Sequence, residues 1–390
     1  MELSNQPAPG LSASQRLVSL DVFRGATIAG MMLVNNPGDW SKIYAPWEHA
    51  AWDGWTYTDT VFPFFLWIVG VAMMLSFAKR MERGDDKGKL AMHVLRRSAI
   101  IFGLGLILAG FPFGLAFGHH FSFLTIRIPG VLQRIAVCYF IVGVLVLNFK
   151  PRVLAGITFS LLALYWILVK TIHVPGFGVG VWTPKGNLAW FIDSHLLKGH
   201  TWSGAPVRGF DPEGILSTIP AIATTLFGVF TGQFLRSERS REEKTAWMFV
   251  AGSVMLLVGL IADNWLPINK NMWTSSYSVF MAGLALTVLG CCYWIIDVKG
   301  WSKWSKPFGI YGQNAITVFF LSGIIGRLTT LIKWTGSDGR GVTLKGWYYH
   351  TLFVPIGDPM VASFAHSIAF VLALYLIAYF MHRMNWIVKV

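Results

Sequence analysis

The residues best suited to chemistry in this chain gather around one histidine. His49 lies in the stretch VNNPGDWSKIYAPWEHAAWDGWTYTD, residues 34 to 59, between two strongly apolar runs. The carboxylates of Glu48, Asp53 and Asp59 are close in sequence, and a carboxylate partner can fix the tautomer of an imidazole, as a general base requires. These residue types favour proton transfer or nucleophilic chemistry at His49.

A second interpretation of His49 stays open. Tryptophan side chains gather at membrane interfaces, where they anchor many membrane proteins, and four of them surround this histidine: Trp40, Trp47, Trp52 and Trp55. His49 could then be one more interfacial side chain. Position and residue type alone do not decide between the two interpretations.

The elements that must position His49 are membrane helices. Of the 390 residues, 54% are hydrophobic and only 13% are charged, and the mean hydropathy is +0.54. A helix needs about 18 or more apolar residues to cross a bilayer. Ten runs qualify: 17–36, 60–78, 94–113, 130–148, 153–170, 214–235, 246–263, 276–296, 307–330 and 360–381. We therefore expect an all-α, polytopic membrane protein with about ten transmembrane helices.

The domain organisation is simple. A polar cytoplasmic tail over residues 1–15 is expected to precede a single transmembrane domain over 16–390, with the first span a retained signal-anchor. Cys138, Cys291 and Cys292 fall inside predicted helices, so no disulfide framework and no metal site are expected. The apolar runs lack the strict alternation of a β-barrel.

Charge predicts the orientation. The short loops on one side of the membrane carry sixteen lysines and arginines, whereas the short loops on the other side carry only Lys42, Arg127 and Lys270. By the positive-inside rule both termini are cytoplasmic and His49 faces the exterior or periplasm. The net charge of +13 is then explained by topology and anionic lipid, and nucleic-acid binding is not expected.

Several polar residues lie within or beside the apolar runs, where a bilayer disfavours them: Asp21, Arg24, Gln133, Arg134, Gln313, Asn314 and His366. Asp21 and Arg24 are three residues apart and can pair on one helix face. Arg134 could clamp an anionic or carbonyl group, and the amides could bond between helices. Ligand contact stays open as the alternative for Arg24 and the amides, while His366 is expected to be a packing residue.

The exterior loops contain a second polar cluster. Carboxylates, amides, a lysine and a tryptophan precede two of the predicted helices: Asp211, Glu213, Asn269, Lys270, Asn271 and Trp273. Helix capping explains single members. Together with Trp52 and Asp53, the mixture is what a sugar site needs, because aromatic rings cover the apolar sugar face and polar groups bind the hydroxyls.

Seven blocks of sequence resemble one family, the heparan-α-glucosaminide N-acetyltransferases, and within it the bacterial branch. They follow in the family's order from about Arg16 to the C-terminal end: SLDVFRG, MLVNN, EHAAWDGWTYTDTVFPFF, RIPGVLQRIAVCYF, FDPEGILSTI, PINKNMWTSSY, and IIDVKG followed by GQNAI. The lysosomal member has an additional N-terminal lumenal domain and helix without a counterpart in these residues. We therefore expect the core chemistry not to require that domain.

The resemblance implies a reaction. The family transfers acetyl from cytosolic acetyl-CoA to the amine of a terminal glucosamine across the membrane, here the bacterial inner membrane. Its active-site histidine falls on His49 and its nearby asparagine on Asn35. The resemblance implies His49 as base or acetylated nucleophile, Asn35 at the thioester carbonyl, and Asp59 or Glu213 orienting the base. The donor is expected at Arg24, Gln133, Arg134, Gln313 and Asn314.

Two other functions remain as alternatives. The chain could transport N-acetylglucosamine or a related amino sugar, although repeated halves with broken helices are not found. It could also acetylate hydroxyls of a cell-envelope glycan. The expected partners are coenzyme A, an amino sugar or oligosaccharide, membrane lipid and a possible second copy of the chain, through small-residue helix faces.

Overall fold

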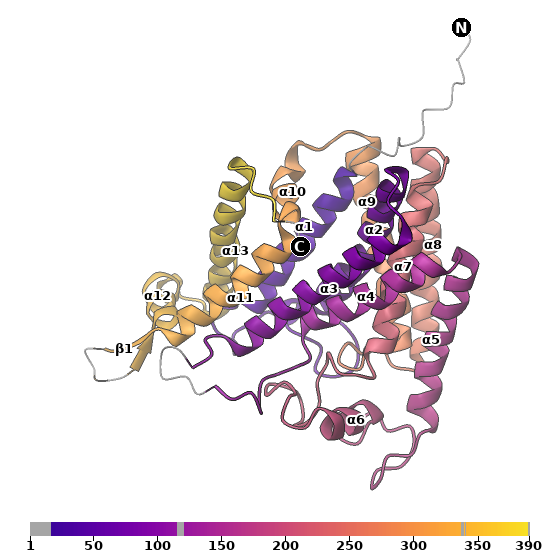
Figure 1. The fold of residues 1–390 in the computed structure, drawn as a ribbon. Helices are drawn as coiled ribbons and strands as arrows, with labels where there is room; N and C mark the ends of the chain where they lie inside the picture. Colours follow the sequence, from indigo (N-terminus) through magenta and orange to yellow (C-terminus); the bar gives the residue numbers. More distant parts are fainter. Residues whose placement is uncertain (1–16, 115–120, 337–338, 340, 389–390) are drawn as a thin grey trace.

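The computed structural model describes residues 17–114, 121–336, 339 and 341–388 (Figure 1). The tail predicted over residues 1–15 lies outside this part. The helices are α1 (Val18–Asn35), α2 (Tyr57–Glu82), α3 (Lys87–Gly110), α4 (Val131–Asn148), α5 (Pro151–Thr171), α6 (Leu188–Leu196), α7 (Thr218–Leu235), α8 (Arg241–Asp263), α9 (Ser275–Tyr293), α10 (Lys306–Gln313), α11 (Ala315–Leu331), α12 (Leu344–Leu352) and α13 (Pro359–Arg383). Short helical turns add η1 (Ala45–Trp47), η2 (Trp294–Val298), η3 (Lys303–Ser305) and η4 (Val354–Ile356).

The helices follow the apolar runs closely, and the chain is a multi-pass membrane protein. Eight helices of the described chain are long and apolar enough to span a bilayer, and the bent pair α10–α11 makes a ninth candidate. The first predicted run, 17–36, corresponds to α1. This helix has 18 residues but is not among these candidates, since Asp21 and Arg24 interrupt its apolar sequence. By length and composition, the described residues therefore contain eight or nine candidate spans, against the ten runs expected from the sequence.

One predicted helix is wrong in shape. Residues 307–330 were expected to form a continuous helix, but the chain breaks at Asn314 and α10 meets α11 at a bend of 72°. Asn314 has φ −120° and ψ 36°, outside the helical region. Its side-chain amide bonds the backbone of Trp386 and Val388. The break places the polar residues of this segment at a bend inside the bundle.

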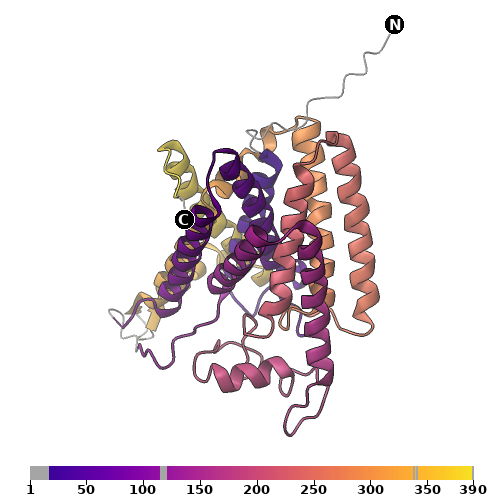
Figure 2. The same ribbon diagram turned by 45° about the vertical axis from the view of Figure 1, so that its right-hand side comes forward.

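Close helix crossings assemble the bundle. α2 packs along α7, and α1 packs along α10. Glycines permit both approaches, because a Cβ at Gly70 would overlap the carbonyl of Thr225 and a Cβ at Gly312 would overlap that of Asp21. α2, α7 and α9 bury more than half of their apolar windows, whereas α3, α5, α8 and α13 bury less than a third. The first set forms the core and the second the periphery (Figure 2).

The bundle has two ends. The His49 end carries the loop after α1 together with α6, α12 and a small antiparallel hairpin, β1 (Lys333–Thr335) with β2 (Gly341–Thr343), in which Trp334 pairs with Val342. In Figure 1 α6 lies at the bottom, and α12 and β1 lie at the lower left. The opposite end carries the α2–α3, α4–α5, α7–α8 and α9–α10 connections, where the sixteen lysines and arginines lie. The hairpin is a minor addition to the expected all-helical fold.

Candidate functional site

His49 is held by the first turn of α2. Its Nδ1 lies 2.6 Å from Oδ1 of Asp59, the third residue of that helix. The other carboxylate oxygen, Oδ2, accepts the backbone N–H groups of Ala50 and Thr56, each at 3.0 Å. Thr56 is the N-cap, so Asp59 takes part in a capping box. The helix start therefore fixes the carboxylate, and the carboxylate fixes the imidazole.

This arrangement, the His49–Asp59 dyad, selects one tautomer of the histidine ring. An ionised carboxylate can only accept, so Nδ1 carries a proton and donates it to Asp59. In the neutral ring, Nε2 then has the lone pair. The His49 side chain is 48% exposed while that of Asp59 is 1% exposed. The dyad therefore has a buried orienting group and an accessible basic nitrogen, which can take a proton or attack an acyl carbon.

The loop that carries His49 is braced against the loop before α9. Gly54 donates its backbone N–H to the Ile268 carbonyl at 2.7 Å, and Asn269 Nδ2 donates to Asp53 Oδ1 at 3.1 Å. Trp52 Nε1 donates to the Trp182 carbonyl at 2.6 Å. Trp52, Asp53 and Asn269, which were expected to contact the sugar, thus bond other parts of the protein.

A basic cavity lies toward the opposite end, at the α10–α11 bend. This hinge cavity has a volume of about 310 Å³ and brings together Arg24, Gln313 and Asn314, three of the five residues expected to bind the donor. Arg24 pairs with Asp21 and donates from Nε to the Gly312 carbonyl at 2.8 Å. Glycine at 312 lets the two helices approach closely enough for this bond.

Two further arginines and a histidine line the hinge cavity and were not expected as site residues: Arg80, Arg97 and His93. Nε of Arg97 and the hydroxyl of Tyr139 are buried there with no hydrogen-bond partner among the described residues, and the guanidinium lies over the Tyr139 ring at 5.0 Å. None of the described residues that line the cavity is acidic. A basic cavity with unsatisfied donors suits an anionic, hydrogen-bonding ligand.

Two more cavities lie toward the His49 end. The loop cavity, about 500 Å³, lies between α3, α4 and the segment before it, and includes Gln133 and Arg327. The α13 cavity, about 330 Å³, includes Asn35 and again Arg327. Gln133 was expected among the donor-binding residues, but it lines the loop cavity and not the hinge cavity. Arg327 was missed altogether.

One stripe of α11 passes all three cavities. Ile316 lines the hinge cavity, and Phe319 and Arg327 line both the loop and the α13 cavities, with Gly323 in the latter. These positions are three or four residues apart, so they share one helix face. Ile316 and Phe319 are separated by less than one turn, about 5 Å of helix axis. The cavities therefore follow one another along the bundle.

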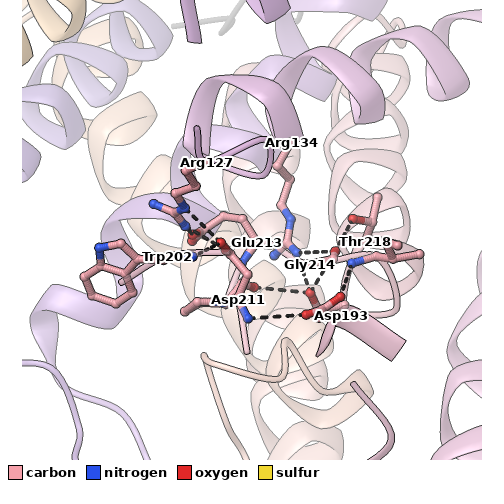
Figure 3. A network of polar contacts seen from close by, with 11 residues as sticks. Arg127, Arg134, Asp193, Trp202, Asp211, Glu213, Gly214 and Thr218 are labelled. Carbon is pink, nitrogen blue, oxygen red and sulfur yellow. Dashed lines mark hydrogen bonds and ion pairs between the residues drawn. The ribbon is translucent and has the colours of Figure 1, made fainter. Parts of the chain in front are cut away.

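An ion cluster braces the His49 end (Figure 3). Arg127 donates from Nε and Nη2 to both carboxylate oxygens of Asp211, at 2.8 and 2.7 Å, and from Nη2 to Glu213 at 2.5 Å. Burial opposes ionisation of Glu213, but the charge of Arg127, helped by Lys270, lowers the pKa of this carboxyl to about 2. Asp211 and Glu213 thus pair with Arg127, and the carboxylate that pairs with His49 is Asp59.

Two expected site residues, Arg134 and Trp273, are buried more deeply than their positions in the sequence suggested. Arg134 is 3% exposed. It donates from Nη2 to the Gly214 carbonyl and the Ser217 hydroxyl, and its Nε and Nη1 find no partner among the described residues. Trp273 is fully buried, donates from Nε1 to Thr224 and stacks below the Arg134 guanidinium. Its ring therefore belongs to the core and not to a loop surface. Lys270 and Asn271 are half-buried beside it.

Comparison with known proteins places these features in a family. The family model described as "Heparan-alpha-glucosaminide N-acetyltransferase, catalytic" matches residues 16–269, which include the dyad and the ion cluster. Heparan-alpha-glucosaminide N-acetyltransferase of Homo sapiens is 32% identical over 353 residues, 78% of this chain and 52% of that protein. The Mus musculus protein of the same name is 30% identical over 363 residues, 80% and 54% of the two chains.

The chain thus spans about half the length of these curated relatives. The family match confirms the resemblance that the seven sequence blocks indicated. The chain belongs to the heparan-alpha-glucosaminide N-acetyltransferase family.

Proposed function

We propose that this protein transfers an acetyl group from acetyl-CoA, bound in the hinge cavity, to the amine of glucosamine or of a terminal glucosaminide at the His49 end. The two relatives are named as N-acetyltransferases of a glucosaminide. The observation that carries the proposal is the His49–Asp59 dyad at one end of a bundle whose other end holds a basic cavity.

The hinge cavity has the chemistry that the donor requires. Acetyl-CoA carries phosphates, and Arg80 and Arg97 would bind them, because guanidinium groups pair well with phosphate oxygens. His93 would add an imidazole N–H donor. The apolar wall made by Phe65, Ile68 and neighbouring residues suits the pantetheine arm. Arg24, Gln313 and Asn314 lie where that arm would run toward the other cavities.

The stripe of α11 supports a path for the thioester. The pantetheine arm is shorter than a bilayer core of about 30 Å, so the donor must enter the bundle with its thioester foremost. The cavities along Ile316, Phe319 and Arg327 lead in this direction. Asn35 lines the α13 cavity and would donate to the thioester carbonyl as negative charge develops on its oxygen.

In the proposed reaction the sugar nitrogen attacks the carbonyl carbon of the thioester. His49 Nε2 takes the proton that the amine loses, the C–S bond breaks, and the imidazolium returns the proton to the coenzyme A thiolate. Asp59 stabilises the imidazolium through Nδ1. In a two-step variant Nε2 first takes the acetyl group itself and then passes it to the amine.

The sixteen basic residues at the opposite end support an orientation with that end in the cytoplasm of a bacterial inner membrane. The donor would then enter from the cytosol, and the acceptor would bind outside. Both ends of the chain would face the cytoplasm.

The test compares His49→Ala with His173→Ala, an exposed histidine outside the proposed site. With purified protein, labelled acetyl-CoA and glucosamine, we expect His49→Ala to lose about 10²-fold or more of the turnover, with coenzyme A affinity within about twofold of wild type. His173→Ala should keep wild-type turnover. Full turnover by His49→Ala would remove the histidine from the mechanism.

A further inference from the structure

The segment after α13 turns back into the bundle. Asn385 has a positive φ of 54°, a conformation that asparagine tolerates better than most residues. Trp386 then donates its backbone N–H to the Met381 carbonyl at 2.8 Å, and its ring meets that of Phe380 edge-on. The chain therefore reverses within a few residues and runs toward the α10–α11 bend.

Asn314 holds this segment at the bend. Its Nδ2 donates to the Trp386 carbonyl at 2.9 Å, and its Oδ1 accepts the Val388 N–H at 3.0 Å. Asn314 is only 2% exposed, so its side-chain amide must be satisfied by a group inside the protein. Here that group is the backbone of the returning segment.

The returning segment also forms part of the hinge cavity. Ile387 and Val388 line it together with Gln313 and Asn314. Both aliphatic side chains are about half exposed, at 50% each, so little apolar burial holds them in place. The two bonds to Asn314 therefore provide much of the attachment.

We propose that residues 384–388, the return segment, are an internal competitor of the donor in the hinge cavity. This inference rests on the proposed function. Asn314 binds the return segment through its NH₂ group as donor and its carbonyl oxygen as acceptor. Each amide of pantetheine offers the same two groups as the backbone, a carbonyl and an N–H. The segment occupies Asn314 when the donor is absent, and the pantetheine arm takes its place when the donor binds.

Proline at Val388 tests the competition, because it removes the N–H that Asn314 accepts. Val388→Ala is the matched control, since it shortens the side chain and keeps the N–H. Relative to Val388→Ala, we expect Val388→Pro to lower the KM for acetyl-CoA about threefold to tenfold with kcat unchanged. An unchanged KM, or a higher one, would overturn the proposal, since the segment would then be neutral or part of the donor site.

A labelling experiment separates this proposal from the proposed function. Ser76 lines the hinge cavity, and Ser76→Cys places a thiol there in a background with Cys291 and Cys292 replaced by serine. In detergent, a maleimide should label this cysteine at least about threefold faster with Val388→Pro than with Val388→Ala, and coenzyme A should slow both. Equal labelling rates of the two variants would contradict the proposal that the return segment occupies the hinge cavity. Faster labelling of Val388→Pro that coenzyme A does not slow would support occupation of the cavity by the return segment and contradict donor binding there.

Discussion

Replacing Asp59 by asparagine should reverse the tautomer of His49. The carboxylate has two distinct tasks, because Oδ2 accepts the N–H groups of Ala50 and Thr56 while Oδ1 accepts from His49. Asparagine has a single acceptor oxygen and an NH₂ group. Only one of the two tasks can therefore be kept.

The structure indicates which task survives. With the amide oxygen toward His49, the NH₂ group would face two backbone N–H donors, and each unsatisfied donor costs about 1–3 kcal/mol. With the oxygen toward the backbone, NH₂ faces Nδ1, which must then accept, so the proton moves to Nε2. The second arrangement is favoured by at least about 2 kcal/mol, which leaves roughly one molecule in 30 with a basic Nε2.

We therefore expect Asp59→Asn to lower kcat by about 10²-fold to 10⁴-fold, because the loss of carboxylate charge adds to the wrong tautomer. The KM values for acetyl-CoA and glucosamine should stay within about threefold. The matched control is Thr56→Ala, which removes the Thr56 hydroxyl bonds to Asp59 and Glu48 and leaves the His49 contact intact. Its kcat should remain near wild type. Turnover by Asp59→Asn within threefold of wild type would refute the role of the dyad.

Three further predictions follow from the cavity and the ion cluster. Arg97→Gln should raise the KM for acetyl-CoA about tenfold and leave the KM for S-acetylpantetheine, which lacks the nucleotide phosphates, unchanged. The control Arg96→Gln, at an exposed neighbouring residue, should change neither KM. Equal effects of Arg97→Gln on both donors would contradict phosphate binding. Arg127→Ala leaves Asp211 and Glu213 buried without their partner, which costs about 3–5 kcal/mol of folding stability. The thermal unfolding temperature in detergent should therefore fall by several degrees. An unchanged unfolding temperature would contradict a stabilising role of the ion cluster. The pKa of Glu213 is about 2 in the folded protein against an ordinary 4.5. Its contribution to folding stability is therefore present above pH 4.5 and is lost as the pH falls toward 2. Glu213→Gln should flatten the decline of the unfolding temperature between these pH values, and parallel curves for the two proteins would contradict the lowered pKa.

The sequence predicted the helices well because lipid-facing segments must be continuously apolar. It did not predict the break at Asn314, since the break depends on backbone partners that arrive from residues 386 and 388. Gln313 and Asn314 within an apolar run were nevertheless a signal that the helix could bend there.

The dyad was predicted in part. Sequence proximity offered Glu48, Asp53 and Asp59 as partners of His49, and the resemblance left Asp59 or Glu213 to orient it. The structure pairs the histidine with Asp59. Glu213 is instead bound by Arg127, a contact across 86 residues that no local pattern reveals.

The basic lining of the hinge cavity was missed because charge at a helix end has two explanations. Arg80 and Arg97 were counted as residues that set the orientation in the membrane. His93 and Arg97 are four residues apart and therefore share a face of α3. An arginine inside the apolar run predicted over 94–113 was a sign of a ligand or partner within the bundle.

Transfer across the membrane is best examined in sealed vesicles that contain the purified protein in one orientation. Labelled acetyl-CoA is supplied on the side of the basic loops, and glucosamine is enclosed on the side of His49. We predict labelled N-acetylglucosamine in the glucosamine compartment for the wild type and none for His49→Ala. Label that stays in acetyl-CoA, or product that forms only when both substrates share one compartment, would contradict transfer through the bundle.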